Sequence, residues 1–517
     1  MKQPNSLALA FSQELAEINH SVRPATSLGD DDAVLHVPET GAVLSGLYET
    51  IRNASQNEQD NLLLISAIRR FIARYFGRVS AKRLANSGKT LICDLTLAGY
   101  LANDSIPLAT VDLITKQIEL SYRLYLGLSK EHSTLQIEEW LMQPLAAKLE
   151  AILRDHSKEM VVANAAYNYF LSVIDRDSIA GVTNDYEVAL YMAVQKVLLR
   201  SDEAMIRYNL LMRYQIDFQN VAAFCDFNGR IDQILTSHGY HAIERLINRH
   251  CAPWRIVLHA AVTDSGLYSK LLLAKDFLQV INQATLNLYI QVNRQIDRGI
   301  IRSIAFLIVT KFIIGLAIEI PYDLAIHQRV AWLALGVNLI LPPLYMLLLR
   351  TTLIMPGPRN TKALARALER IFFVPISDAS IRVREQHFSR WFNVLYYLSI
   401  IGIFAAASWL LIRFAQFEVV HLIIFFVFIS TASFLGFRIS RKIRELEVGD
   451  EAATAATMLR DAIYMPFVNV GRYLSETYAH INIVSKLLDM LVELPMKTII
   501  AFLRRWSSFI SAKKDEL

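Results

Sequence analysis

The sequence predicts an all-α integral membrane protein with a large N-terminal cytosolic helical domain and two transmembrane helical hairpins. Three observations support this fold class. The chain of 517 residues is 53% hydrophobic, and its mean hydropathy of +0.30 is high for a soluble chain. Four apolar segments of membrane-spanning length follow one another in the second half. The first half carries apolar residues at helical spacing, without a period-2 strand pattern.

Charge, the N-terminal stretch and the cysteines indicate in which compartment the soluble part of the chain lies. Charged residues make up 20% of the chain, which predicts a sizeable soluble part beside the membrane part. The N-terminal stretch "MKQPNSLALAFSQELAEINH" has its apolar run interrupted by polar residues, so we expect a short amphipathic helix and no signal peptide. Three cysteines far apart give no disulfide framework and fit a reducing compartment: Cys93, Cys225 and Cys251.

Residues 1–295 read as a soluble helical domain. Apolar residues recur three and four positions apart in "EQDNLLLISAIRRFIARYF", "IPLATVDLITKQIELSYRLYLGL" and "YEVALYMAVQKVLLR". Ser133 and Gln136 form a capping box before "IEEWL". Such a chain needs helix-on-helix packing, as a bundle or a stacked solenoid. An amphipathic linker helix over 264–302 is expected to run on into the first apolar segment.

The four apolar segments pair into hairpins at 303–350 and 394–438. Their sequences are "SIAFLIVTKFIIGLAIEIP", "AWLALGVNLILPPLYMLLL", "VLYYLSIIGIFAAASWLLI" and "VVHLIIFFVFISTASFLGF". Each has about the 20 residues that cross a bilayer as a helix. The turns "YDLAIHQRV" and "RFAQFE" are short, and a basic cytosolic loop over 351–391 separates the hairpins.

Positive charge predicts the orientation. The two short turns hold only Arg329 and Arg413, whereas the other segment ends are rich in arginine and lysine, which favours the cytosolic side. We therefore expect the protein in the inner membrane of the cell. Its N-terminus, its middle loop and its C-terminus should lie in the cytosol. The basic residues at those ends are Arg294, Arg298, Arg302, Arg350, Arg359, Lys362, Arg366, Arg370, Arg382, Arg384, Arg390, Arg438, Arg441, Lys442 and Arg444.

The tail over 439–517 is expected to be cytosolic and amphipathic. Its last part could lie on the anionic inner leaflet or dock on the cytosolic domain, and the sequence leaves both open. The membrane-surface candidates there are Lys497, Arg504, Arg505, Trp506, Lys513 and Lys514. The final residues, Lys514–Leu517, spell a luminal retention signal. A cytosolic C-terminus predicts that this signal is not read.

Several stretches resemble a family of uncharacterised multi-span membrane proteins from small-genome, candidate-phylum bacteria. They are "CDLTLAGYLANDSIP", "YEVALYMAVQKVLLRSDEAMIRYNLL", "AIEIPYDL" and "LLDMLVELPMKTIIAFLRRWSSFISAKKDEL". They are scattered over most of the chain, and none is a catalytic signature. The resemblance implies a bacterial inner membrane. It carries over no functional residue, because the family has no assigned activity.

The candidate site lies in the first hairpin. Lys311 and Glu319 fall within or at the edge of the first apolar segment, where a charge costs about 2.5–3.5 kcal/mol on insertion scales. Their spacing of eight places them on nearly one helix face, which Asn338 of the second segment could meet. Asp323 follows Pro321 at the outer mouth. This group predicts either an ion or substrate path, or a polar clamp that holds the helices together.

Other patterns fail the spacing that their chemistry needs. "SHGYHAIERLINRHC" gathers histidines, but its spacing is no known zinc pattern. "LANSGKT" resembles half of a phosphate loop, yet Arg83 stands where the first glycine is required. Basic residues cluster at membrane borders, so nucleic-acid binding is not expected. We predict no metal, no cofactor and no catalytic constellation; an enzyme of unknown type stays the weakest reading.

Two functions follow as expectations. The leading one is a non-enzymatic membrane scaffold or tether, which uses its cytosolic helical domain to bind a cytosolic protein partner. The alternative is a channel or transporter that uses the polar residues of the first hairpin. Four membrane helices are few for a monomeric transporter, so this reading needs a homo-oligomer. Convergence of polar residues from different segments on a cavity would favour transport, whereas a dry bundle would favour the scaffold.

Overall fold

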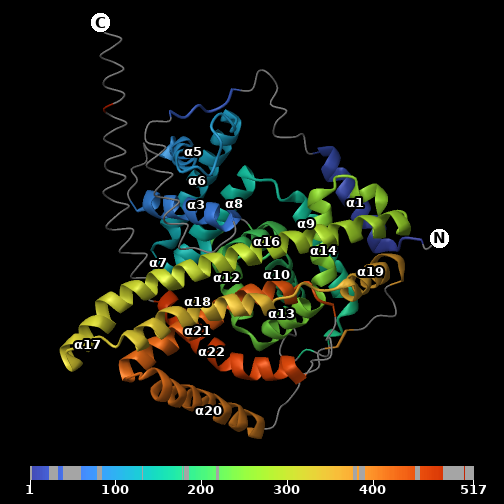
Figure 1. Ribbon diagram of the computed structural model, residues 1–517. Helices are drawn as coiled ribbons and strands as arrows, with labels where there is room; N and C mark the ends of the chain where they lie inside the picture. Colours follow the sequence, from blue (N-terminus) through green and yellow to red (C-terminus); the bar gives the residue numbers. More distant parts are fainter. Residues whose placement is uncertain are drawn as a thin grey trace. The chain divides into compact units, whose positions relative to one another are not determined.

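The computed structural model describes residues 3–21, 33–38, 60–77, 84–130, 132–176, 179, 185–216, 220–375, 381–382, 390–448, 455–480 and 506. The protein is all-helical over these residues, as predicted (Figure 1). They form two compact units, each described by itself. The N-terminal unit holds the described residues of Leu9–Ile247 with Ile381 and Trp506. The C-terminal unit holds residues 3–8 and the described residues of Asn248–Asp378 and Arg382–Asn482.

The N-terminal unit is built from short and medium helices. They are α1 (Ser6–Ser21), α3 (Asp60–Phe76), α5 (Ser87–Leu97), α6 (Leu108–Leu128), α7 (Thr134–Ile137), the π-helical turn η1 (Glu138–Met142), α8 (Gln143–Leu153), α9 (Ser157–Val173), α10 (Tyr186–Leu198), α11 (Glu203–Arg213), α12 (Val221–Thr236) and α13 (His238–His250). The amphipathic helix predicted at the N-terminus is α1, whose first residues belong to the C-terminal unit.

Helical periodicity sets which faces of this unit are buried. α6 buries one residue in every turn or so, from Val111 to Leu128, and packs this stripe against α5 and α8. The predicted capping box is present: the Ser133 hydroxyl accepts from the backbone N–H of Gln136, whose side chain accepts from the Ser133 N–H in return. The resulting core joins side chains of α3, α5, α6, α8, α11 and α12.

The C-terminal unit contains the long helices. They are α14 (Ala252–Thr263), α15 (Leu267–Lys270), α16 (Ala274–Ile314), the π-helical turn η3 (Gly315–Glu319), α17 (Ile320–His327), α18 (Trp332–Thr352), α19 (Pro358–Phe373), α20 (Arg390–Ala415), α21 (Val419–Arg444) and α22 (Ala455–His480). α16, η3 and α17 continue one another without a break, over 54 residues. The predicted linker helix is the first part of this rod, beginning at Ala274.

The first half of α16 packs on soluble-type helices of the same unit. Phe277 of α16 meets Phe372 of α19 edge-on, and Trp254 of α14 meets the same ring. Asn5 joins the end of α19, where its side-chain amide donates to the carbonyls of Ile371 and Val374. α14, α15 and the start of α16 therefore pack with the apolar helices, and the two units divide at Ile247.

Both π-helical turns stand just before a proline. Pro144 follows the end of η1 by two residues, and Pro321 follows the end of η3 by two residues. Proline lacks the N–H of a regular helix, and its ring crowds the carbonyl four residues earlier. A wider turn at that place relieves the crowding, so the helix continues through the proline.

Gly88 of the "LANSGKT" stretch has a packing role. It lies on α5 where this helix crosses α6, and an added Cβ would come within 2.5 Å of the Val111 carbonyl oxygen and 2.4 Å of the Thr115 hydroxyl. The Thr115 hydroxyl instead accepts from the Gly88 N–H. Glycine at this position is explained by close approach of two helices, without a bound phosphate.

Replacing Gly88 by alanine should lower the free energy of unfolding by about 1–3 kcal/mol, because backbone or helix must shift to admit the methyl group. Gly229 on α12 is the matched control, since nothing lies within 4 Å of its added Cβ. Gly229→Ala should leave stability unchanged or raise it by about 0.5–1 kcal/mol. Thermal unfolding of the full chain in detergent measures both, and equal effects would contradict the close-contact role.

Candidate functional site

Four helices among the described residues are long and apolar enough to cross a membrane. They are Ala274–His327, Trp332–Thr352, Arg390–Ala415 and Val419–Arg444. Each of the four predicted apolar segments lies in one of them. α16, α18 and α21 pack against one another, and α20 contacts α18 and α22 (Figure 1). The number of apolar helices was therefore correctly predicted from length and composition.

The charged residues of the first apolar segment pair with each other. The Lys311 ammonium donates to Oε1 of Glu319, and it also lies 5.1 Å from the centre of the Phe428 ring. Neither side chain is more than 2% exposed. The predicted meeting of Lys311 and Glu319 is thus present, as a buried ion pair within one continuous rod.

The π-helical turn η3 creates the alignment of this pair. An α-helix turns about 100° per residue, so a regular helix would place position 319 about 80° away from position 311. The spacing of eight is therefore not enough to put both charges on one face, contrary to the expectation from the sequence. The turn Gly315–Glu319 lies between them and admits an extra residue without an extra turn. Glu319 therefore occupies the place that the seventh residue after Lys311 has in a regular helix, directly along the same face.

Asn338 of α18 joins the pair to α21. Its side-chain amide donates to Oε1 of Glu319, at 3.2 Å, and to the backbone carbonyl of His421, also at 3.2 Å. Asn338 and His421 are fully buried. One amide group thus links the first, second and fourth apolar helices.

Asp323 has a structural partner and a charged neighbour. One carboxylate oxygen accepts from the Ala331 N–H at 2.8 Å, which satisfies the start of α18. Its other oxygen lies 3.5 Å from Nε2 of His421, and both side chains are 1% exposed or less. Closer to the end of the hairpins, His327 and Glu418 are within 2.8 Å and half-exposed.

The polar cluster is not saturated by its own chain. Five buried atoms in it have no hydrogen-bond partner among the described residues: Oε2 of Glu319, Oδ1 of Asp323, Oδ1 of Asn338, and Nδ1 and Nε2 of His421. Buried polar atoms in native proteins are nearly all hydrogen-bonded to protein, water or an ion. This cluster is therefore chemically suited to hold a small polar species among the helices.

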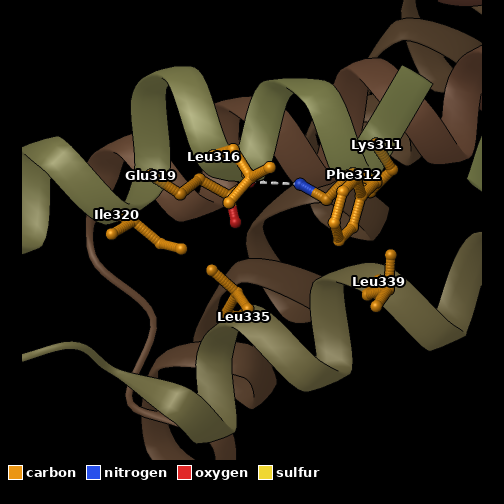
Figure 2. Close-up of a pocket in the computed structure, with 8 residues that line it drawn as sticks. Lys311, Phe312, Leu316, Glu319, Ile320, Leu335 and Leu339 are labelled. Atoms are coloured by element: carbon orange, nitrogen blue, oxygen red, sulfur yellow. Dashed lines mark hydrogen bonds and ion pairs between the residues drawn. The ribbon is translucent and has the colours of Figure 1, made fainter. Parts of the chain in front are cut away.

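A pocket opens beside the ion pair, with an empty volume of about 310 Å³ that includes the space at its mouth. It lies between the α16–α17 rod and α18. Figure 2 shows Lys311 and Glu319 directed toward each other, with Leu335 and Leu339 facing them from α18. Apart from this pair the lining is apolar: Phe312, Gly315, Leu316, Ile320, Leu335 and Leu339.

The basic ends of the long helices meet at one level. Arg350 at the end of α18 donates to Asp297 and Asn293 of α16, and Lys442 at the end of α21 donates to Gln295. Since Lys311 lies about 21 Å along α16 from Asp297, these contacts form a polar layer well separated from the buried cluster. The apolar parts of three helices thus begin together.

Part of the predicted tail packs on an apolar helix. In α22, the Tyr464 hydroxyl donates to the Ser433 carbonyl of α21. An added Cβ at Gly471 would lie 2.1 Å from the Ser430 carbonyl oxygen, so the two backbones nearly touch. Trp506 is 54% exposed. The other membrane-surface candidates lie outside the described residues: Lys497, Arg504, Arg505, Lys513 and Lys514.

Titratable groups elsewhere have structural explanations. Hydrogen bonds that His156 donates to the carboxylates of Glu150 and Glu159 raise the pKa of His156 to about 10, so this side chain stays charged at neutral pH. Burial raises the pKa of the Cys251 thiol to about 11, which suppresses the reactive thiolate. In the part of the chain that the structure describes, no three His, Cys, Asp or Glu side chains gather as a metal site requires.

Comparison with known proteins gives no match: no protein-family model, curated protein or solved structure is similar to this chain. The resemblance noted from the sequence stays a prediction, and the function must be argued from the site. The one site residue that sequence reasoning missed, His421, carries a usable signal. It is a titratable side chain near the start of the apolar run "VVHLIIFFVF".

The buried ion pair should show strong energetic coupling. Lys311→Met and Glu319→Gln each leave an uncompensated group among apolar helices, and each should lower stability by about 3–5 kcal/mol. The double variant should lose less than either single variant, because no charge is then left unpaired. Unfolding of the detergent-solubilised protein, followed as a double-mutant cycle, measures the coupling. Losses that simply add would show that the two side chains are not paired.

Proposed function

We propose that this is an integral membrane protein whose four apolar helices cross the bilayer as two hairpins. The support is the surface of these helices, which would be costly to expose to water over such a continuous area. Large apolar side chains on them are more than half exposed, among them Phe306, Phe312, Trp332, Ile340, Tyr397 and Trp409. A bilayer covers such a surface without hydrophobic cost.

The proposed orientation places the basic layer at the cytosolic border. Arg350, Lys442 and the arginines of α16 gather where three apolar helices begin, which agrees with the rule that cytosolic borders are positive. The cluster from Lys311 to Asp323 then lies in the half of the membrane away from the cytosol. Both chain termini would be cytosolic, at the inner membrane of a bacterial cell.

Within this frame, the function that the geometry supports best is ion translocation, with the proton as the ion. The observation that supports this proposal is the set of buried atoms without a hydrogen-bond partner on Glu319, Asp323, Asn338 and His421. Ionisable residues inside membrane helices usually mark ion pathways or proton relays. The groups run along one side of the bundle from mid-membrane toward the half-exposed His327–Glu418 pair, so neighbouring sites can hold and pass a proton.

Each residue of the cluster would have its own role in proton transfer. Glu319 and Asp323 can hold a proton on a carboxylate, and His421 can hold one on either ring nitrogen. Lys311 keeps the cluster close to neutral when Glu319 is ionised, which limits the electrostatic cost of charge inside the membrane. Asn338 fixes the position of the Glu319 carboxylate. Four helices are few for such a path, so we propose that copies of the chain associate.

A membrane scaffold is the second candidate. Its support is α6 in the N-terminal unit, where Leu113 and Leu120, seven residues apart and therefore on one helix face, are 44% and 48% exposed. Exposed leucines on one helix suit a protein partner. On this reading, Leu113→Ser with Leu120→Ser should abolish cross-linking of a partner that the full-length wild-type chain captures in membranes. An unchanged cross-link pattern would count against the scaffold.

Proton flux should be measurable in vesicles that contain the purified protein and a pH-sensitive dye. A membrane potential should drive proton uptake. In vesicles matched for the amount of folded protein, Glu319→Gln should lower the rate by at least about tenfold, because the amide cannot carry the proton. Thr310→Val is the matched control. Thr310 precedes Lys311 on α16, and its hydroxyl donates only to carbonyls of its own helix, those of Phe306 and Leu307. Its removal should leave the flux unchanged.

Wild-type vesicles no leakier than protein-free vesicles would reject ion translocation, and equal flux in wild type and Glu319→Gln would reject the role of the cluster in it. The scaffold would then be the better-supported candidate. A change that is equal in Glu319→Gln and Thr310→Val would also reject the role of the cluster, since it would reflect general damage to the helix.

The proposed orientation predicts the behaviour of reporters. A cytosol-specific fluorescent reporter fused after Leu517 should be active, because both termini lie on the side of the basic layer. The same reporter inserted after Gln328, in the turn between α17 and α18, should be inactive, and a reporter specific for the far side should show the opposite pattern. The turn is a suitable insertion point because residues 324–329 are exposed. Activity on the same side at both positions would refute the first hairpin.

A further inference from the structure

The pocket beside Lys311 and Glu319 combines apolar walls with one polar end. Six of its eight lining residues are apolar or glycine, and the other two form the ion pair. Phe312 and Leu316 at this pocket are 60% and 53% exposed. On the proposed membrane topology, the pocket is therefore open to the lipid around the helix bundle. Asp323 and His421, in contrast, lie in the interior of the bundle.

The polar end offers both an acceptor and a donor. Oε2 of Glu319 has no hydrogen-bond partner among the described residues although the side chain is fully buried. Lys311 gives one N–H to Oε1 of Glu319, and an ammonium has three donors. Figure 2 shows both groups at the pocket, opposite the leucines of α18. A hydroxyl can satisfy both, since its hydrogen donates to Oε2 while its oxygen accepts from Lys311.

Charge selects a neutral ligand. The Lys311–Glu319 pair is neutral as a unit, and its surroundings are apolar, so a charged ligand would leave a net charge there. The carboxylate of an acidic ligand would be repelled by the unpartnered oxygen of Glu319, and the ammonium of a basic ligand would be repelled by Lys311. The pocket is open at its side, where Phe312 and Leu316 are exposed, so the head of an amphiphile can lie in it while the tail follows these two residues into the lipid.

We propose that this pocket binds a neutral amphiphile with a single hydroxyl head, which enters sideways from the bilayer. The hydroxyl bonds to Oε2 of Glu319 and to the Lys311 ammonium, and the hydrocarbon part packs between the α16–α17 rod and α18. The inference rests on the membrane insertion proposed above. It does not require that the cluster conducts protons.

Photolabelling of the full-length protein in lipid nanodiscs tests the site. The probe is a photoactivatable octanol with a diazirine group, and peptide mapping locates the label. Label should concentrate in Phe312–Ile320 and Leu335–Leu339, and excess octanol should compete it away at least about fivefold better than octanoate or octylamine. Label spread evenly over the apolar helices, or equal competition by all three compounds, would overturn the proposal.

Two variants of α18 give a second measurement. Leu339→Trp fills the pocket and should reduce labelling at least about fivefold. Ile340→Trp is the control, because Ile340 is 61% exposed and does not line the pocket; it should label like wild type. Proton flux is recorded in vesicles of the same preparations. Flux without site-specific label rejects this proposal alone, and site-specific label without flux rejects ion translocation alone.

Discussion

The ion pair of Lys311 and Glu319 constrains the arrangement of the apolar helices. Neither charge can face lipid or an apolar neighbour without a large penalty, so the side of α16 that bears them must turn inward. That side is the one that packs on α18 and α21, and it also buries Ser303 and Leu307. The opposite side of the rod is left apolar and exposed. One buried pair thus fixes the rotation of the longest helix of the unit.

This pairing depends on a backbone irregularity. Pro321 cannot continue a regular α-helical turn, and the wider turn η3 that precedes it shifts Glu319 onto the face of Lys311. The same relation of π-helical turn and proline at Pro144 shows that the device is local, because the two sites share no packing environment. At Pro321 the irregularity has a chemical consequence. It converts a helix that would present two charges on different faces into one that pairs them.

Much of this architecture could be predicted from local patterns. Length and apolarity were sufficient for the four long helices, and the capping box at Ser133 depends only on residues three apart. Asn338 was a candidate because it is a polar residue of the second segment that could meet the face of Lys311 and Glu319. The remaining features depend on contacts between distant segments. The packing of α22 on α21 needs glycine at 471 against the Ser430 backbone, and no spacing within either helix reveals that contact. His421 joins the site only through contacts with Asn338 and Asp323, which lie about a hundred residues earlier in the chain, so no local spacing reveals its place.

The position of the polar cluster determines where a barrier to proton transfer would lie. Between Lys311 and the basic layer at Asp297, α16 contributes Leu307 and Ile300 to the interior, both almost fully buried. The polar groups at intermediate depth are hydroxyls: Ser433 donates to the Tyr345 hydroxyl at 3.1 Å, and Tyr464 donates to the Ser433 carbonyl. Hydroxyls can relay a proton but do not hold charge at neutral pH. The carboxylates and the histidine of the cluster lie in the other half of the bundle, so a proton path through this level would have to use these hydroxyls.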